Sequence, residues 1–110
     1  MMSKKILIAL HDNDIAPRFD LATEVLIVTG IGKLDTNNRR IVVLPRASAD
    51  QLCHLVITEG VETVICGGIE DDYYQYLIWK RIEVIDSVIG SSEAALKRFI
   101  EGTLKPGEIL

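Results

Sequence analysis

Residues 62–69 read Glu-Thr-Val-Ile-Cys-Gly-Gly-Ile, and this segment decides the fold. Glu62–Cys66 is short and largely apolar, which predicts a buried strand. Gly67-Gly68 ends that strand, because paired glycines favour a turn. Helical patterns lie on both sides of the segment, and strands joined through helices require right-handed parallel crossovers. The segment therefore predicts the parallel part of an α/β sheet.

The helix before this strand is predicted from a cap and an apolar face. Ser48 or Asp50 can cap it, because either side-chain oxygen can accept a hydrogen bond from a free backbone N–H. Gly60 favours an end to the helix. Apolar residues fall at i, i+3, i+4 and i+7, namely Ala49, Leu52, Cys53 and Val56. This position favours core packing for the Cys53 side chain.

Two more helices are predicted after the strand. Acidic residues 70–72 open one that runs to about Lys80, which matches the helix dipole. A fifth strand, Glu83–Ser87, separates it from a helix capped by Ser91 or Ser92 and ended by Gly102. The last helix carries an apolar stripe of Ala95, Leu96, Phe99 and Ile100. The chain is predicted to be a single domain, 1–110, in which 103–110 form a C-terminal tail.

Three strands are predicted before the first helix. They are Lys5–Leu10, Val25–Thr29 and Arg39–Leu44, and Pro45 ends the third. The stretch Gly30–Asn38 is predicted to be a hairpin connection. Short connections make these strands antiparallel neighbours. The predicted fold is α/β: a mixed five-stranded sheet in the order βββαβαβα, with helices on its faces, as in a ribonuclease H-like layout.

The composition excludes several classes of function. The 110 residues carry a net charge of −4 and are 48% hydrophobic, which favours a folded domain and argues against nucleic-acid binding. The only cysteines, Cys53 and Cys66, do not form the paired motif of a structural zinc site. The apolar run 6–10 is too short for a membrane span, so we expect a cytoplasmic protein with reduced thiols and no membrane partner.

Three segments resemble the sequence of a known family. Residues 16–22, Ala-Pro-Arg-Phe-Asp-Leu-Ala, resemble its loop Ser-Pro-His-Phe-Gly-Arg-Ala, and residues 64–69 are similar to its turn Val-Ile-Cys-Gly-Gly-Ile. Residues 92–96 and 101–104 resemble its last helix and glycine-containing tail. The family is the dinitrogenase iron–molybdenum cofactor biosynthesis family. The resemblance implies a ribonuclease H-like fold and a non-enzymatic accessory protein that carries a molybdenum- or iron-containing metal–sulfur cluster.

The chain departs from the family loop at two positions. Arg18 stands where the family usually has histidine, and Asp20 stands where it has glycine. A histidine ligand is therefore absent at that position. Arginine does not ligate metals as an ordinary cation, but its fork of donors can pair with an anionic cluster. Phe19 between them either shields the cluster or anchors the loop to the core.

Cys66 is the main candidate metal ligand. It ends a predicted strand, and ligands of open α/β sheets bind outside such ends. A thiolate there can bind a soft metal. Gly67, Gly68 and Ile69 form the turn, where missing side chains let a bulky ligand approach. The alternative is that Cys66 is a buried apolar residue and the glycines only permit the turn.

His11 is the second candidate metal ligand, since it ends the first strand and imidazole suits several transition metals. The candidate site is thus a cleft between the loop 11–20 and the turn 66–69. The resemblance implies a cluster donor or acceptor protein as a further partner. Acidic residues 70–72 argue against a bare oxyanion at the turn.

Two other functions stay open. The first is a protein-interaction or regulatory module without metal, which would use the aromatic residues of the second helix: Tyr73, Tyr74, Tyr76 and Trp79. The second is a metal-dependent hydrolase on a ribonuclease H-like scaffold. Asp12 and Asp14 follow the first strand, but Cys66 occupies a position where such an enzyme needs another carboxylate.

Overall fold

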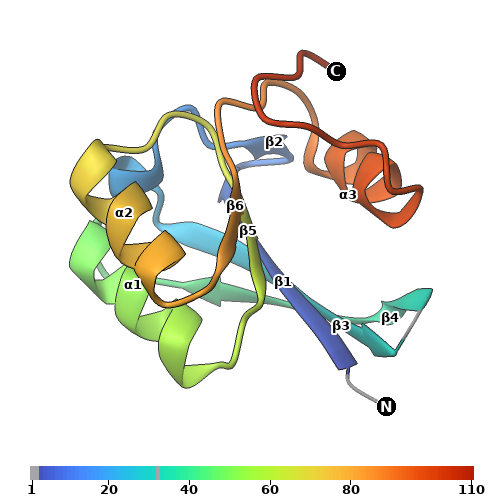
Figure 1. The fold of residues 1–110 in the computed structure, drawn as a ribbon, viewed down its shortest axis with the longest axis horizontal. Coiled ribbons are helices and arrows are strands. Elements are labelled where there is room, and N and C mark those ends of the chain that lie inside the picture. The colour runs from blue at the N-terminus through green and yellow to red at the C-terminus, as the bar shows by residue number, and fades with distance from the viewer. Residues whose placement is uncertain (1–2, 32) are drawn as a thin grey trace.

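The computed structural model describes residues 3–31 and 33–110, and its strands form one mixed sheet (Figure 1). Five strands lie side by side: β1 Ser3–His11, β3 Glu24–Ile31, β4 Lys33–Val43, β5 Thr63–Ile65 and β6 Glu83–Ile85. Their order across the sheet is β4-β3-β1-β5-β6. A short strand, β2 (Asp14–Ile15), pairs with β1 outside this path.

The strand directions confirm the predicted topology. β3 pairs antiparallel with both β1 and β4. β5 pairs in parallel with β1 on one side and with β6 on the other. Helix α1 (Ala49–Thr58) precedes β5, and helix α2 (Asp71–Trp79) connects β5 to β6. The ribonuclease H-like label stays a prediction from the sequence.

The prediction of five strands is wrong by one short strand. The sequence predicts a loop at 11–20, yet the chain reverses there and places Leu10 opposite Ile15 and His11 opposite Asp14. Asp12 makes the reversal with a φ of 56°, a left-handed conformation that aspartate tolerates. Ile15 is buried. Within β2 itself Ile15 is the buried residue, and the polar residues around it hide the strand.

The predicted hairpin connection at Gly30–Asn38 is also too long. β3 continues to Ile31 and β4 begins at Lys33, so both strands extend into the predicted connection. Residue 32 lies outside the described residues. The continuous polar run 35–40 on β4 explains the error, because an edge strand needs few apolar side chains.

Helices cover both faces of the sheet. In Figure 1, α1 and α2 lie on one side, and α3 (Ser92–Ile100) lies on the other. Two apolar clusters fill the spaces between these layers. The first includes Leu7, Ala9, Phe19, Leu52, Val64, Cys66 and Leu77. The second includes Ile6, Ile8, Leu26, Ile65, Ile85 and Leu96. Within the described ranges, every helix is too short or too polar to cross a bilayer.

The predicted caps and apolar faces are largely confirmed. The Ser48 hydroxyl accepts a hydrogen bond from the Gln51 N–H, and the Ser91 hydroxyl accepts one from the Ala94 N–H. The predicted apolar face of α1 is buried in full: Ala49, Leu52, Cys53 and Val56. The stripe on α3 is wrong at Ile100, which is 45% exposed.

The predicted tail packs against the rest of the chain. The Gly107 N–H donates to the Asp86 carbonyl, at 2.9 Å, and the Leu110 N–H donates to the Ile89 carbonyl, at 2.8 Å. In the other direction, the Ile89 N–H donates to the Glu108 carbonyl at 3.0 Å. Residues 106–110 therefore behave as an added edge along the loop that follows β6.

Candidate functional site

The candidate site lies where three parallel strands end. β1 ends at His11, β5 at Ile65 and β6 at Ile85. Because these strands run in parallel, their carboxyl ends meet at one edge of the sheet, which is where open α/β sheets bind ligands. The loop 12–23, the turn 66–70 and the loop 86–91 all lie at this edge.

The loop after β1 is held by backbone contacts at both ends. The Ala16 N–H donates to the Ala9 carbonyl at 2.8 Å, and the Ile15 N–H donates to the Gly90 carbonyl at 2.9 Å. A 3₁₀ helix, η1 (Phe19–Leu21), follows. The Phe19 side chain is completely buried in the cluster below α1 and α2. Of its two predicted roles, anchoring the loop to the core is therefore the one the structure supports.

The two predicted walls of the site contact each other directly. The Phe19 N–H donates to the Gly68 carbonyl at 2.8 Å, and the Gly68 N–H donates to the Pro17 carbonyl at 2.7 Å. A Cβ atom at Gly67 would lie 2.4 Å from the Ala16 oxygen and 2.5 Å from the Pro17 oxygen. Position 67 thus requires glycine, because the backbone of the loop after β1 lies too close for a side chain. The space beside Gly67 is already filled by this loop.

Cys66 is a buried thiol beneath this contact. Its side chain is 0% exposed and packs in the cluster with Phe19 and Val64. Burial raises the pKa of the Cys66 thiol to about 12, and the carboxylate of Asp86 adds to the rise. Metal ligation requires the thiolate. In this conformation Cys66 therefore behaves as an apolar core residue.

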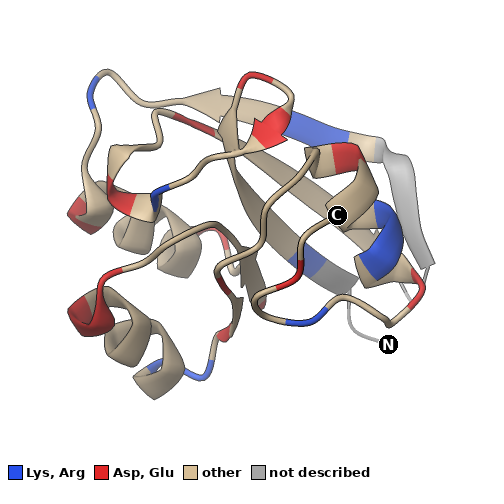
Figure 2. Cartoon of the chain, turned by 90° about the horizontal axis from the view of Figure 1, so that it is seen from above, with Lys and Arg blue, Asp and Glu red and all other residues tan. Residues whose placement is uncertain are grey.

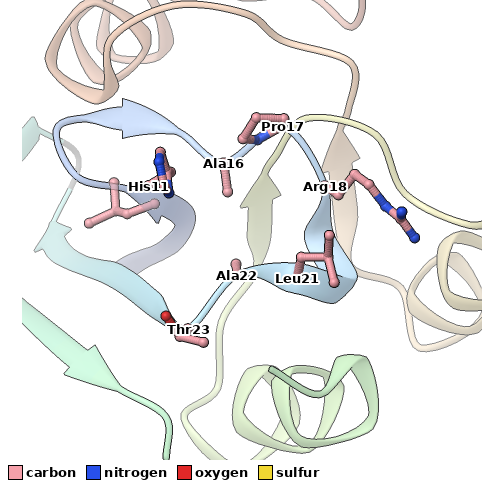
Figure 3. Close-up of a pocket in the computed structure, with 8 residues that line it drawn as sticks. His11, Ala16, Pro17, Arg18, Leu21, Ala22 and Thr23 are labelled. Carbon is pink, nitrogen blue, oxygen red and sulfur yellow. The ribbon is translucent and has the colours of Figure 1, made fainter. Parts of the chain in front are cut away.

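A cavity of about 330 Å³ opens beside the joined walls (Figure 3). Its lining is mostly apolar and consists of Leu10, His11, Ala16, Pro17, Arg18, Leu21, Ala22 and Thr23. Most of these residues belong to the segment 16–22. Leu21 is 58% exposed at its edge. A mostly apolar cavity with a few polar groups is typical of a small-ligand site.

Arg18 is held by its neighbour in the loop. Its Nε donates to Oδ1 of Asp20 at 3.0 Å, and a terminal guanidinium nitrogen donates to Oδ2 at 2.6 Å. Both bonds together form a bidentate pair. Figure 3 shows the Arg18 side chain extending away from the other lining residues. The cationic fork is therefore occupied by Asp20 and does not point into the cavity.

His11 is an accessible side chain of the cavity lining, of a type that can bind metals. Its side chain is 75% exposed, and Nε2 lies 4.0 Å from Oδ2 of Asp12. The structure places His11 and Arg18 around one cavity. It does not place Cys66, Gly67, Gly68 or Ile69 among the lining residues. Among the described residues, no group of three or more His, Cys, Asp and Glu side chains is arranged to hold a metal ion.

Several lining residues were not predicted from the sequence. Leu10, Pro17, Leu21, Ala22 and Thr23 complete the cavity. For Pro17, Leu21 and Ala22 a signal was present, since they belong to the segment 16–22. The sequence contains no signal that Leu10 or Thr23 lines a cavity, because Leu10 is predicted to end a strand and Thr23 to lie in a loop.

Comparison with solved structures supports the fold. The crystal structure of PH0822 has a TM-score of 0.82 and 24% identity, covering 93% of both chains. The NMR structure of a protein from Methanococcus jannaschii, provisionally named a dinitrogenase, has a TM-score of 0.74 and 21% identity, covering 96% of this chain and 94% of the other. A Thermotoga protein provisionally named NifB, assigned to the DUF35 family, has a TM-score of 0.71 and 19% identity, covering 94% and 92%.

Comparison with family models identifies the chain itself. No curated protein matches it. The family model described as dinitrogenase iron–molybdenum cofactor matches residues 2–102, which include the segments 16–22 and 64–69 and nearly the whole sheet. The sequence resemblance noted for these segments is thereby confirmed over most of the chain. The protein belongs to the dinitrogenase iron–molybdenum cofactor family.

Proposed function

We propose that this protein carries a molybdenum- or iron-containing metal–sulfur cluster as cargo and does not transform it. The observation that carries the proposal is the cavity at the carboxyl edge of the sheet, because its lining comes mainly from the segment 16–22 that resembles the family loop. The family match relates the chain to the iron–molybdenum cofactor. The lining offers the exposed imidazole of His11 beside this mostly apolar surface.

In this proposal, His11 and Arg18 contact the cargo directly. The exposed imidazole of His11 can ligate iron or molybdenum without any rearrangement. Arg18 can balance the charge of an anionic cluster once its guanidinium leaves Asp20. Phe19, Gly67, Gly68 and Ile69 would act indirectly, by holding the loop and the turn in place.

Cys66 enters the proposal as a second ligand that needs a conformational change. In this proposal the thiol becomes accessible when the loop 16–19 separates from Gly68, which breaks the two hydrogen bonds between them. Exposure would also lower the pKa of the thiol towards its ordinary value, because burial is the main cause of the increase. Ligation by Cys66 should therefore follow a fast first contact as a slower step.

The test uses tetrathiomolybdate, with iron plus sulfide as a second probe, and purified full-length protein under anaerobic conditions. Binding is followed by absorbance over time, and metal per chain is measured after gel filtration. His11→Ala should weaken the fast phase, whereas His54→Ala on α1 should not, since His54 does not line this cavity. Cys66→Ser should remove the slow phase, and Cys53→Ser should leave it intact.

The outcomes separate the parts of the proposal. Failure of the wild-type protein to retain metal from either probe would contradict carriage of such a cluster. Retention that survives His11→Ala unchanged would exclude the cavity as the site of first contact. A single fast phase in both wild type and Cys66→Ser would remove only the thiolate step.

We also propose that the protein works in the cytoplasm and exchanges its cargo with a donor or acceptor protein. Both cysteines are free thiols, which suits a reducing compartment. Isolation of the tagged protein from anaerobic cytosol, followed by metal analysis of the co-purified complex, would test the exchange. Recovery of the cargo only on the protein alone, and never in a complex with a second protein, would contradict this exchange.

A further inference from the structure

A second groove lies on the helical face, away from the cargo cavity. It runs between α1 and α2, has a volume of about 460 Å³, and shares no lining residue with that cavity. Its lining consists of Asp50, Cys53, His54, Asp72, Tyr73 and Tyr76. The groove therefore combines two carboxylates with two phenol rings.

The carboxylates give the groove a negative charge. Asp50 lies in the first turn of α1 and Asp72 in the first turn of α2. Figure 2 shows the two helices side by side, with acidic residues at the start of each. Among the side chains that the structure describes, neither carboxylate forms an ion pair. The carboxylate of Asp50 raises the pKa of the Tyr73 phenol, which lines the same groove.

An exposed aromatic ridge continues from the groove along α2. Asp72, Tyr76 and Trp79 are spaced at i, i+4 and i+7, so they share one face of the helix. Tyr76 is 38% exposed and Trp79 is 72% exposed, and their ring centroids lie 6.2 Å apart. Large exposed aromatic side chains of this kind are enriched in protein interfaces.

The ridge already binds a cation from the same chain. The ammonium nitrogen of Lys80 lies 4.8 Å from the centroid of the Trp79 ring and 5.8 Å from that of the Tyr76 ring. These are distances at which a cation is attracted to an aromatic face. The aromatic side chains beside the groove are therefore placed where they can attract a positive charge.

We propose that this groove and ridge form a docking surface for a protein partner that inserts a lysine or arginine side chain between α1 and α2. Two carboxylates without an ion-pair partner in the described structure supply charge complementarity, and the ring of Tyr76 supplies contact area for the aliphatic part of the inserted side chain. We take the partner to be a protein because the groove continues into the exposed rings of Tyr76 and Trp79, and large exposed aromatic side chains are enriched in protein interfaces. This proposal is independent of the cargo cavity.

The test uses an eight-residue peptide with one arginine between two leucines, and the same peptide with citrulline in place of arginine. Citrulline keeps the shape of the side chain and removes its charge. Trp79 is the only tryptophan of the chain, so its fluorescence reports on the ridge. Amide shifts of ¹⁵N-labelled full-length protein locate the peptide. We expect fluorescence changes and shifts confined to residues 50–54 and 72–80 with the arginine peptide.

Matched variants separate local from general charge effects. Asp50→Asn with Asp72→Asn should weaken the arginine peptide about tenfold, from two partly screened ion pairs. Asp12→Asn with Glu101→Gln removes the same charge at exposed positions outside the groove and should leave the affinity unchanged. Asparagine also tolerates the left-handed backbone at position 12. Unchanged circular dichroism of both variants shows that they fold.

Four outcomes of the peptide experiments would overturn the proposal. They are equal binding of the citrulline peptide, equal weakening by the two double variants, shifts outside the groove and ridge, and no shifts at millimolar peptide. A concentration-dependent dimer in sedimentation velocity that is lost in Asp50→Asn/Asp72→Asn would make a second copy the occupant and likewise overturn it.

Discussion

Replacing Asp20 by Asn should strengthen the binding of an anionic metal–sulfur probe. The reason is competition, since Asp20 holds the Arg18 guanidinium through bonds of 3.0 and 2.6 Å. An anionic cargo must displace this carboxylate before it can use the fork. Asparagine keeps the size of the side chain and removes the charge, so the guanidinium is released without opening a cavity.

The size of the effect follows from the exposure of the pair. The Arg18 side chain is 58% exposed and that of Asp20 is 20% exposed, so solvent screens the interaction. Exposed ion pairs contribute about 0.2–1 kcal/mol, and bidentate geometry favours the upper part of that range. If the cargo no longer competes with this pair, its affinity should rise by up to about fivefold. The loss of folding stability should stay within about 1 kcal/mol.

The assay is a titration with tetrathiomolybdate at low and high salt. Asp14→Asn serves as a control, because it removes one charge from the same loop without touching Arg18. The gain from Asp20→Asn should shrink at high salt, where screening weakens exposed charges. It should vanish in an Arg18→Ala background. Weaker or unchanged binding by Asp20→Asn, or an equal gain without Arg18, would refute the competition.

Three further predictions concern stability and reactivity. Gly67→Ala should destabilise the protein by about 2 kcal/mol or more in urea unfolding, while Gly68→Ala should cost much less, since the added Cβ would lie 2.4 Å from a backbone oxygen in the first case and 3.4 Å in the second. Cys66 should resist iodoacetamide at pH 8 without denaturant. Folding stability should fall above about pH 9, because the thiols of the unfolded chain then release protons that the folded thiols retain, with pKa values of about 11 for Cys53 and about 12 for Cys66. Cys66→Ala should flatten this decline of stability with pH, and an identical slope in the variant would contradict the reasoning. The Glu108 carboxylate should stabilise the C-terminal segment at pH values above the ordinary pKa of a glutamate, and this stabilisation should be lost in acid. The reason is that the hydrogen bond from the Lys105 N–H, followed by the contact with Arg98, lowers the pKa of this carboxyl. Amide exchange at Ile89 that does not change in Glu108→Gln at neutral pH would contradict this prediction.

Much of the fold could be predicted because its signals are local. The apolar face of α1 repeats with the period of a helix, and Ser48 and Ser91 are the capping residues. The parallel placement of β5 and β6 follows from the helices on either side of them. Each of these features depends on residues within a few turns of chain, which is the range over which a sequence pattern is informative.

The features that were missed depend on contacts between distant backbones. β2 is fixed partly by the hydrogen bond between Ile15 and Gly90, and the C-terminal segment is fixed by the bonds between Ile89 and residues 108 and 110. Backbone groups carry no sequence signal, so polar segments such as 11–20 and 103–110 appear irregular until their partners are known. The Arg18–Asp20 pair was missed for another reason. The sequence suggested that the Arg18 guanidinium is available to an anionic cluster, and only the geometry shows that it is bound to the Asp20 carboxylate.

Cys66 shows that a position at a strand end does not by itself make a side chain accessible. The sequence places it at a strand end beside two glycines, and the structure agrees. Side chains two residues apart on a strand share a face, so Cys66 points with Val64 into the layer under α1 and α2. The accessible donor at this sheet edge is instead His11, which ends the neighbouring strand β1.

Two of the three segments that carry the family resemblance, 16–22 and 64–69, contact each other. Pro17 and Phe19 bond to Gly68, and Gly67 has room for no side chain because of the backbone at 16–17. The similar residues in these two segments are therefore explained first by the contact between their backbones, and not by a chemical role of their side chains. In the proposed function, the exposed lining residues that are available to contact a cargo include His11, Arg18 and Leu21. Of these, Arg18 stands where the family usually has histidine, and its partner Asp20 stands where the family has glycine. The cargo preference of this chain should thus depend on whether Arg18 pairs with Asp20 or with the cluster.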